Sequence, residues 1–297
     1  MKRHYDSVIG SRAIKGWSET SKLPMLWLWV AYVTALLAAV ASVVGLLQAD
    51  LIYGRETVVL ADAAIAQDVV MLFVVVPLLV FLSLRARSGS LVAFLWLPGV
   101  LAFAVYNYMI YAFSIHFGPL FLVWVAILGL SIFALIGVLV SADMEAIKRM
   151  FVSQKLTGTA VFLVVVAVFF GFLWLSEIVP DLLSGSLSTS ASDWQIPTNP
   201  VHVLDLSFFL PAVVMSGLLL WWRHPLGYAT AAGQLVWLAL TCLPILVTPL
   251  VSNFRGHPAG WIVMLPIGLL FLAILAVLGF LLRRIADKSQ MGADEIP

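Results

Sequence analysis

The sequence has very little charge. Only 10% of its 297 residues are Asp, Glu, Lys or Arg, whereas 63% are apolar, and the mean hydropathy is +1.08. A typical soluble domain is roughly 25% charged and about 45–50% apolar. A soluble chain of this composition could not cover its surface with polar groups. The shortage of charge therefore excludes a soluble enzyme, a nucleic-acid-binding protein and a disordered chain, and it favours an integral membrane protein with several spans.

The sequence also lacks most of the residues on which common chemistries depend. Its single cysteine, Cys242, cannot form an internal disulfide, a C-x-x-C redox pair or a c-type haem attachment site. The motifs G-x-x-x-x-G-K-[ST], G-x-S-x-G and H-E-x-x-H and the glycine-rich dinucleotide fingerprint are absent. No connection between the apolar runs is long enough for a soluble catalytic domain. The sequence thus gives no support to an enzyme and indicates no cofactor.

Eight apolar runs have the length of about 17–25 residues that crosses roughly 30 Å of hydrocarbon. They do not alternate polar and apolar residues as barrel strands do, so we expect an all-α polytopic fold. The first run is too long for a cleaved signal peptide and is expected to be a signal anchor. The predicted spans are residues 26–48, 69–84, 91–113, 119–140, 158–178, 206–222, 226–247 and 258–282.

The basic residues predict the orientation. All but two of the 16 Lys and Arg residues fall in the tails and in alternate connections, which an even number of spans places on one side. The exceptions are Arg55 and Arg255, and we expect Arg255 to pair with an acid. The positive-inside rule then places both termini in the cytoplasm. The prediction is a plasma-membrane protein, and specifically one of a bacterial inner membrane.

The two halves of the chain resemble each other. Asp68 and Asp205 precede the second and sixth runs, and Arg85 and Arg223 close them, with the same spacing to within one residue. Each of these two runs also holds one proline. Four spans per half give both halves the same orientation, so the pattern predicts a parallel 4+4 repeat. The predicted parts are a cytoplasmic tail (1–25), a first half (26–141), a cytoplasmic linker (142–157), a second half (158–283) and a second cytoplasmic tail (284–297).

Asp68 and Asp205 are candidate functional residues. The runs that they precede are shorter than the hydrocarbon thickness, so each helix is expected to extend upstream and to draw its aspartate into the membrane boundary. A carboxylate there is costly unless it faces protein or water. The alternative is an Asp that is favourably placed in the first turn of a helix.

Residues 197–205 contain a clear helix start. Asn199 is expected to cap a helix whose first residue is Pro200. His202 and Asp205 then lie one turn apart on the same face. They form either an interfacial His–Asp contact or a proton-handling or ligand-binding pair that faces a cavity.

Two further polar residues are candidates for the same site. Glu177 ends the fifth run and is either interfacial or joins Asp68 and Asp205 around a central cavity. Asn107 lies deeper in the third run, where we expect it to bond to a neighbouring helix.

Three histidines, His116, His202 and His257, lie on the predicted outer side, where convergent imidazoles could hold a metal or haem. No two of them share a short ligand spacing such as H-x-x-x-H. The sequence therefore predicts no metal site, and these three are the candidate ligands if one exists.

Residues 172–211 carry a resemblance to a family. The stretches Leu173-Trp174-Leu175-Ser176-Glu177-Ile178-Val179-Pro180 and 197–205 resemble those of uncharacterised eight-span membrane proteins of bacteria, which implies no activity. The eight-span, two-half plan is also similar in architecture to haem A synthase. That family has paired histidines in its even-numbered spans, whereas the second span here offers Asp68 and no histidine. The outer cysteine pair of many members is missing as well, so the likeness is architectural only.

Three functions follow as hypotheses. The first is transport of a small solute or ion, which predicts a water-filled cavity between the halves lined by Asp68, Glu177 and Asp205. The second is a haem or metal enzyme, which predicts convergent histidines. The third is a non-catalytic subunit or sensor, which predicts a lipid-facing patch of small residues and no cavity. The partners expected are the lipid bilayer and a small solute or proton, and the oligomeric state stays open.

Overall fold

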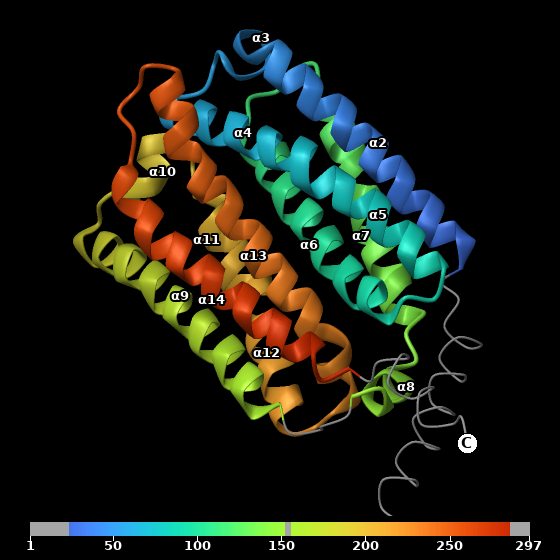
Figure 1. Cartoon of the computed structure of the whole chain (residues 1–297). Coiled ribbons are helices and arrows are strands. Elements are labelled where there is room, and N and C mark those ends of the chain that lie inside the picture. The colour runs from blue at the N-terminus through green and yellow to red at the C-terminus, as the bar shows by residue number, and fades with distance from the viewer. Residues whose placement is uncertain (1–23, 152–155, 286–297) are drawn as a thin grey trace, which may run out of the picture.

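The computed structural model describes residues 24–151 and 156–285, and these residues are helical, with no strand among them beyond one isolated bridge between Phe151 and Ile285. Nearly all of the two predicted cytoplasmic tails lies outside the described residues. Eight helical segments in the described part are long and apolar enough to cross a membrane, which makes the chain a multi-pass membrane protein. They form a bundle whose two described chain ends lie at the same end, beside α8 (Figure 1).

The eight spans and the short helices have the following bounds. In the first half they are α2 (Met25–Leu47), then α4 (Val58–Val70), η1 (Met71–Val75) and α5 (Val76–Arg87) as one continuous span, then α6 (Leu91–Ser114) and α7 (Phe121–Val140). In the second half they are α9 (Thr157–Ser184), then α11 (Pro200–Leu204), η2 (Asp205–Phe209) and α12 (Leu210–Trp221) as one span, then α13 (Pro225–Phe254), η3 (Trp261–Val263) and α14 (Met264–Leu282). The connections hold α3 (Ala49–Tyr53), α8 (Met144–Arg149) and α10 (Thr189–Trp194).

The predicted start of the second span is wrong by three turns of helix. The span begins at Val58, capped by the Thr57 hydroxyl, so Asp68 lies well inside the helix and not at its first turn. Asp62, Gln67 and Asp68 lower the hydropathy of this stretch without breaking the helix. The sixth span extends upstream as expected, to Pro200, and the Asn199 side chain accepts from the Val201 amide at 2.9 Å, as a cap should.

Both of these spans contain one turn of π-helix immediately before a proline. η1 precedes Pro77 and η2 precedes Pro211. A proline inside a helix has no N–H to donate and collides with the preceding turn, and a widened π turn relieves that conflict. The offset along the chain between the two π turns equals the offset between the two prolines. The offset between Asp68 and Asp205 is three residues longer. The two aspartates therefore do not occupy equivalent positions relative to the bulges.

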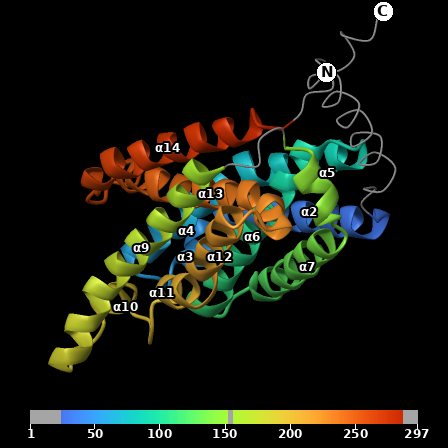
Figure 2. The ribbon, with the colours of Figure 1, turned by 90° about the horizontal axis from the view of Figure 1, so that it is seen from below.

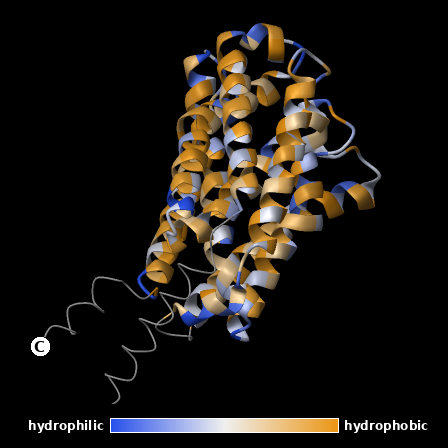
Figure 3. Cartoon of the chain, turned by 90° about the vertical axis from the view of Figure 1, so that its right-hand side faces the viewer, coloured by the Kyte–Doolittle hydropathy of each residue, from blue (hydrophilic) through white to orange (hydrophobic). Residues whose placement is uncertain are grey.

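Apolar side chains cover the outside of the bundle as well as its core, as the hydropathy colouring shows (Figure 3). Phe73, Phe113, Val140 and Phe172 are all largely exposed on membrane-length helices. Such faces suit hydrocarbon and not water. The span α6 is the most buried and α14 the least, so α6 is the centre of the bundle and α14 lies at its edge.

The two halves pack differently. In the first half, α2 contacts both α5 and α7, and α6 contacts the same two helices, which closes a ring of four. The Trp27 ring of α2 fills the space where Gly137 of α7 has no side chain. In the second half, α9 packs on α12, α12 on α13 and α13 on α14, but α9 and α14 touch at few positions. These two helices diverge in the view of Figure 2.

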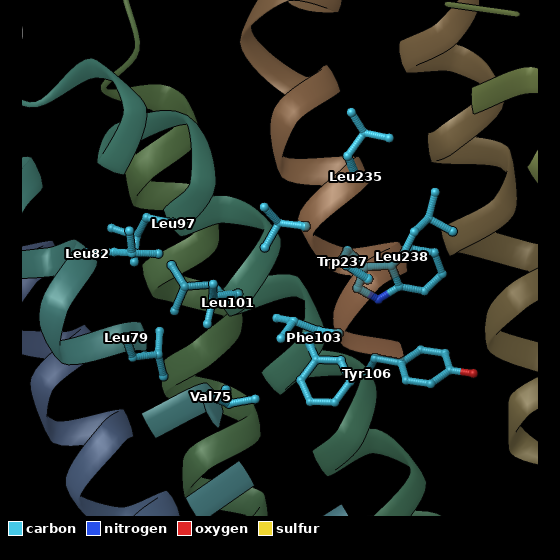
Figure 4. Packing of buried hydrophobic residues seen from close by; sticks show 14 of the residues in the cluster. Val75, Leu79, Leu82, Leu97, Leu101, Phe103, Tyr106, Leu235, Trp237 and Leu238 are labelled. Atoms are coloured by element: carbon cyan, nitrogen blue, oxygen red, sulfur yellow. The ribbon is translucent and has the colours of Figure 1, made fainter. Parts of the chain in front are cut away.

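The halves meet along α6 and α13. The backbones are closest at Gly99 and Gly233, where a Cβ on Gly99 would overlap the carbonyl oxygen of Gly233. Larger residues further along the two helices complete this interface, among them Phe103 and Tyr106 of α6 and Trp237 of α13 (Figure 4). The same contact continues from α13 onto α4. It is this seam that places a cavity next to Asp205.

Candidate functional site

Asp205 is a buried carboxylate with one oxygen unused. It is the first residue of η2, and only 6% of its surface is exposed. Its Oδ2 accepts a hydrogen bond from the Trp174 indole nitrogen of α9 at 2.8 Å, and the Tyr106 hydroxyl of α6 is also in its electrostatic field. Its Oδ1 is buried and has no hydrogen-bond partner among the described residues. A buried acceptor without a partner is rare in native proteins and calls for an explanation.

A cavity of about 420 Å³ lies beside Asp205. Its volume is within the range of pockets that hold small organic molecules. Both halves contribute to its wall, which includes Leu60, Ala64 and Gln67 of α4, Phe103, Tyr106 and Tyr111 of α6, Trp174 of α9, Trp194 of α10, Trp237, Thr241 and Cys242 of α13, and Ile267 and Ile274 of α14. Residues of both halves thus line one cavity, but of the three carboxylates that the transport hypothesis places around it, only Asp205 is among the described residues of the wall.

The wall of this cavity is mostly apolar and aromatic. Among the described residues that line it, none is Lys, Arg or His, and Asp205 is the single carboxylate. Trp237 stacks on Phe209 with the ring centres 4.9 Å apart, and Tyr106 meets both rings edge-on. Asp205 is thus a lone acid in an aromatic enclosure, without a basic side chain to neutralise it.

His202 pairs with Glu177 and not with Asp205. Its Nε2 is 3.7 Å from Glu177 Oε2, and the Trp174 ring lies against its imidazole with the ring centres 4.8 Å apart. Trp174 therefore contacts His202 on one side and Asp205 on the other. Glu177 also accepts from the Ser190 amide of α10 and is about one-third exposed. Neither His202 nor Glu177 is part of the cavity wall.

Asp68 occupies a closed pocket in the first half. The Tyr53 hydroxyl of α3 donates to its Oδ2 at 2.5 Å, and both residues are 2% exposed. Burial, and then the neighbouring Asp68 carboxylate, raises the pKa of Tyr53 well above its ordinary value, so this hydroxyl stays protonated and donates. Gly45 of α2 packs directly on the carboxylate, where a Cβ would overlap Oδ2. Asp68 does not line the cavity, contrary to the expectation of the transport hypothesis.

Asn107 does not make the interhelical bond that the sequence predicted. Its side chain is fully buried in α6, and neither the amide oxygen nor the amide nitrogen has a partner in the described residues. The neighbouring Tyr108 hydroxyl and the Ser42 hydroxyl of α2 are also buried and without a partner. The space between α2, α4 and α6 therefore holds several polar groups that the protein alone does not satisfy.

Asp62 and Glu56 were missed by the sequence reasoning. Asp62 of α4 is 2% exposed and accepts from Arg255 at 2.6 Å and contacts His257 at 2.9 Å, which ties the first half to the connection after α13. The expectation that Arg255 pairs with an acid is confirmed. The fully buried Glu56 side chain contacts His116 at 3.0 Å. Asp62 lies one helical turn before residues 65 and 66, in an apolar helix. It could have been found from this position, but the predicted second span begins after it.

The three candidate metal ligands are separated, because each contacts a different carboxylate: His116 contacts Glu56, His202 contacts Glu177 and His257 contacts Asp62. Across residues 24–151 and 156–285, no group of three or more His, Cys, Asp or Glu side chains is arranged to hold a metal ion. The convergence that the haem or metal hypothesis predicts is not found there.

Comparison of the chain with protein-family models, with curated proteins and with solved structures finds no match.

Proposed function

We propose that this protein moves a small solute across the membrane through the cavity between its two halves. The observation that carries the proposal is the cavity itself, which is lined by six membrane-length segments from both halves and by one buried carboxylate whose second oxygen has no partner among the described residues. Carboxylates within membrane spans mark the paths of substrates and protons. Solute sites of transporters with internal repeats lie near the interface of the repeats.

The proposal includes the parallel 4+4 repeat and both termini on the cytoplasmic side. The matching second and sixth spans, each with a π turn and a proline, support a common origin of the halves. The basic residues Arg85, Arg149, Arg223 and Arg284 lie at the end of the bundle opposite to α3 and α10, which supports a cytoplasmic position for that end. A π turn next to a proline is also a point at which a helix bends. The sixth span can thus change its direction beside Asp205.

The alternative function is a non-catalytic subunit. The exposure of α14 favours this function, because most of the surface of this helix is not covered by the rest of the protein. A Cβ on its Gly268 or Gly279 would meet no other atom within 4 Å. A partner helix could therefore pack closely against these glycines. A subunit of this kind needs no cavity, whereas a transporter needs a cavity that opens to each side in turn. This requirement separates the two functions without knowledge of the solute.

The native single cysteine allows the test. Cys242 lines the cavity and is otherwise buried. Sealed membrane vesicles of both orientations are treated with small membrane-impermeant methanethiosulfonates, one cationic and one anionic, and modification of Cys242 is measured by mass spectrometry. We expect one or both reagents to modify Cys242 from either face. The Cys242→Ser variant gives the background.

Two control variants report on the faces of the vesicles. In the Cys242→Ser background, Asp50→Cys in α3 and Ser88→Cys after α5 place exposed thiols at opposite ends of the bundle. Each should react from one face only, and the face that modifies Ser88→Cys is expected to be cytoplasmic. Modification of Cys242 from a single face, or from neither, would reject transport and leave the subunit as the better proposal.

A further inference from the structure

We propose that the cavity binds lipophilic organic cations, that is, molecules with apolar arms around a single positive charge, and that Asp205 is their counter-ion. This inference rests on the proposed function, because it names the class of solute that the same cavity carries.

The charge of the wall calls for a cation. Asp205 Oδ1 is buried without a partner, and the wall offers no basic side chain. The attraction between unit charges grows as the surroundings become less polar, so a cation that enters this apolar space is held strongly by Asp205. An anion would meet the like charge of Asp205 and no compensating group. The sign of the charge that fits is therefore positive.

The aromatic rings favour an organic cation over a metal ion. Tyr106, Trp174 and Trp237 all line the cavity with Asp205. Aromatic faces attract quaternary and other weakly hydrated cations, above all when the site is dry. A metal ion would need several oxygen or nitrogen ligands, and the wall near Asp205 provides mainly rings and aliphatic groups. A large cation with apolar arms satisfies both the rings and the carboxylate.

The way into the cavity also suits an apolar molecule. Side chains of α9, such as Phe170 and Leu173, and side chains of α14, such as Ile267 and Leu270, form two edges of the wall. These two helices touch at few positions, whereas the corresponding helices α2 and α7 of the first half are packed together. Both α9 and α14 present apolar faces to the membrane. A solute that dissolves in the lipid can therefore reach the cavity between them.

Two probes of almost the same shape and opposite charge test the inference. Tetraphenylphosphonium is a cation and tetraphenylborate is an anion. Binding of each to the detergent-purified full chain is measured by isothermal titration calorimetry, and the fluorescence of the tryptophans in the wall reports whether the probe occupies the cavity. We expect tetraphenylphosphonium to bind at least about tenfold more tightly than tetraphenylborate, as one well-placed charge contact allows.

Matched variants test whether the preference for the cationic probe comes from Asp205. Asp205→Asn should remove most of the preference for the cation, and Asp205→Glu, which keeps the charge, should restore it. Asp68→Asn makes the same change at a buried aspartate outside the wall and should leave the preference intact. Asp50→Asn removes an exposed charge and controls for general electrostatics. Size-exclusion chromatography checks that each variant is folded.

The outcomes distinguish this inference from the proposed function. Equal binding of the two probes, tighter binding of the anion, or a preference that survives Asp205→Asn would overturn the assignment of lipophilic cations. If Cys242 is still modified from both faces of the membrane in that case, transport stands and the solute belongs to another class. If the cation binds through Asp205 but Cys242 reacts from one face only, the cavity is a binding site and the transport proposal fails.

Discussion

The two halves of this protein each bury an aspartate in their second span, but the surroundings of the two residues differ. Asp68 is enclosed by α2 and α3, receives the Tyr53 hydroxyl at 2.5 Å and lies against Gly45. Asp205 accepts a hydrogen bond from the Trp174 indole, lies close to the Tyr106 hydroxyl and lines a cavity, and its Oδ1 has no partner among the described residues. The same residue type thus takes part in close packing at one site and lines a cavity at the other.

The neighbouring helices explain this difference. In the first half, α2 packs on α4, α5 and α7, and its Gly45 lies directly against Asp68, so the space around this carboxylate is filled. In the second half, α9 and α14 stand apart, and the volume between them is lined by both halves. A buried acid is therefore informative about function only when the packing around it is known. The predictions below test how far the closed and the open site differ.

The largest effect is expected at Gly45. Gly45→Leu would force a side chain into the position of the Asp68 carboxylate and the Tyr53 hydroxyl. Overpacking of a filled site costs typically about 1–3 kcal/mol, and displacement of a buried acid adds to it, so we expect a loss of at least about 3 kcal/mol. The measurement is unfolding in mixed micelles with increasing SDS. Gly171→Leu in α9 is the matched control, since a side chain there meets no other atom. Equal stability of the two variants would show that the first half is not closed around Asp68.

The next effect is expected where the halves are tied together. Asp62→Asn leaves Arg255 and His257 without their carboxylate. Loss of one partner of a buried pair costs about 3–5 kcal/mol, but the Arg255 side chain is 29% exposed and can be hydrated in part, so we expect about 2 kcal/mol. The same SDS titration measures it. Glu56→Gln should cost less, because its partner His116 is 54% exposed. The reverse order would contradict the view that Asp62 holds the two halves together.

A smaller effect compares the two aspartates directly. Tyr53→Phe removes a hydrogen-bond donor to Asp68, and Trp174→Phe removes a hydrogen-bond donor to Asp205. At the closed site no water can replace the donor, so Tyr53→Phe should cost about 1.5 kcal/mol, as for a hydrogen bond to a charged group. At the open site water in the cavity can take its place, and Trp174→Phe should cost less than about 0.5 kcal/mol. Chemical denaturation of both variants in the same detergent decides this. Similar losses would mean that the two sites are equally closed.

Much of this fold follows from the sequence, because a long unbroken run of apolar residues in a membrane has few structures available other than a helix. The number of spans and most of their bounds were predicted in this way. The prediction failed at residues 58–68, where Asp62, Gln67 and Asp68 lowered the hydropathy of a helix that is nevertheless continuous. These polar residues are buried by protein and not by lipid. A hydropathy pattern cannot separate the two environments.

The site was predictable only in part. Asp205 was a candidate because of its position in a short apolar run, and the cap at Asn199 followed from the Asn-Pro pair. The partners of these residues were not predictable, since Trp174, Tyr106 and Trp237 come from three other helices and meet only through tertiary packing. For the same reason the pairing of His202 with Glu177 differs from the expected contact with Asp205. Contacts between helices that are distant in sequence leave no local pattern.

The smallest effect concerns the rate at which Cys242 reacts. Cys242 and Asp205 both line the cavity, so the field of the carboxylate should concentrate a cationic thiol reagent near the cysteine and repel an anionic one. We expect the cationic methanethiosulfonate to react several times faster than the anionic one with the detergent-solubilised protein, and Asp205→Asn to bring the two rates together. Asp68→Asn should leave the ratio unchanged, because Asp68 is enclosed by Tyr53 and Gly45 and is absent from the cavity wall. If Asp68→Asn alters the ratio as much as Asp205→Asn does, the two aspartates act on one common space, and the contrast between a closed and an open half is wrong.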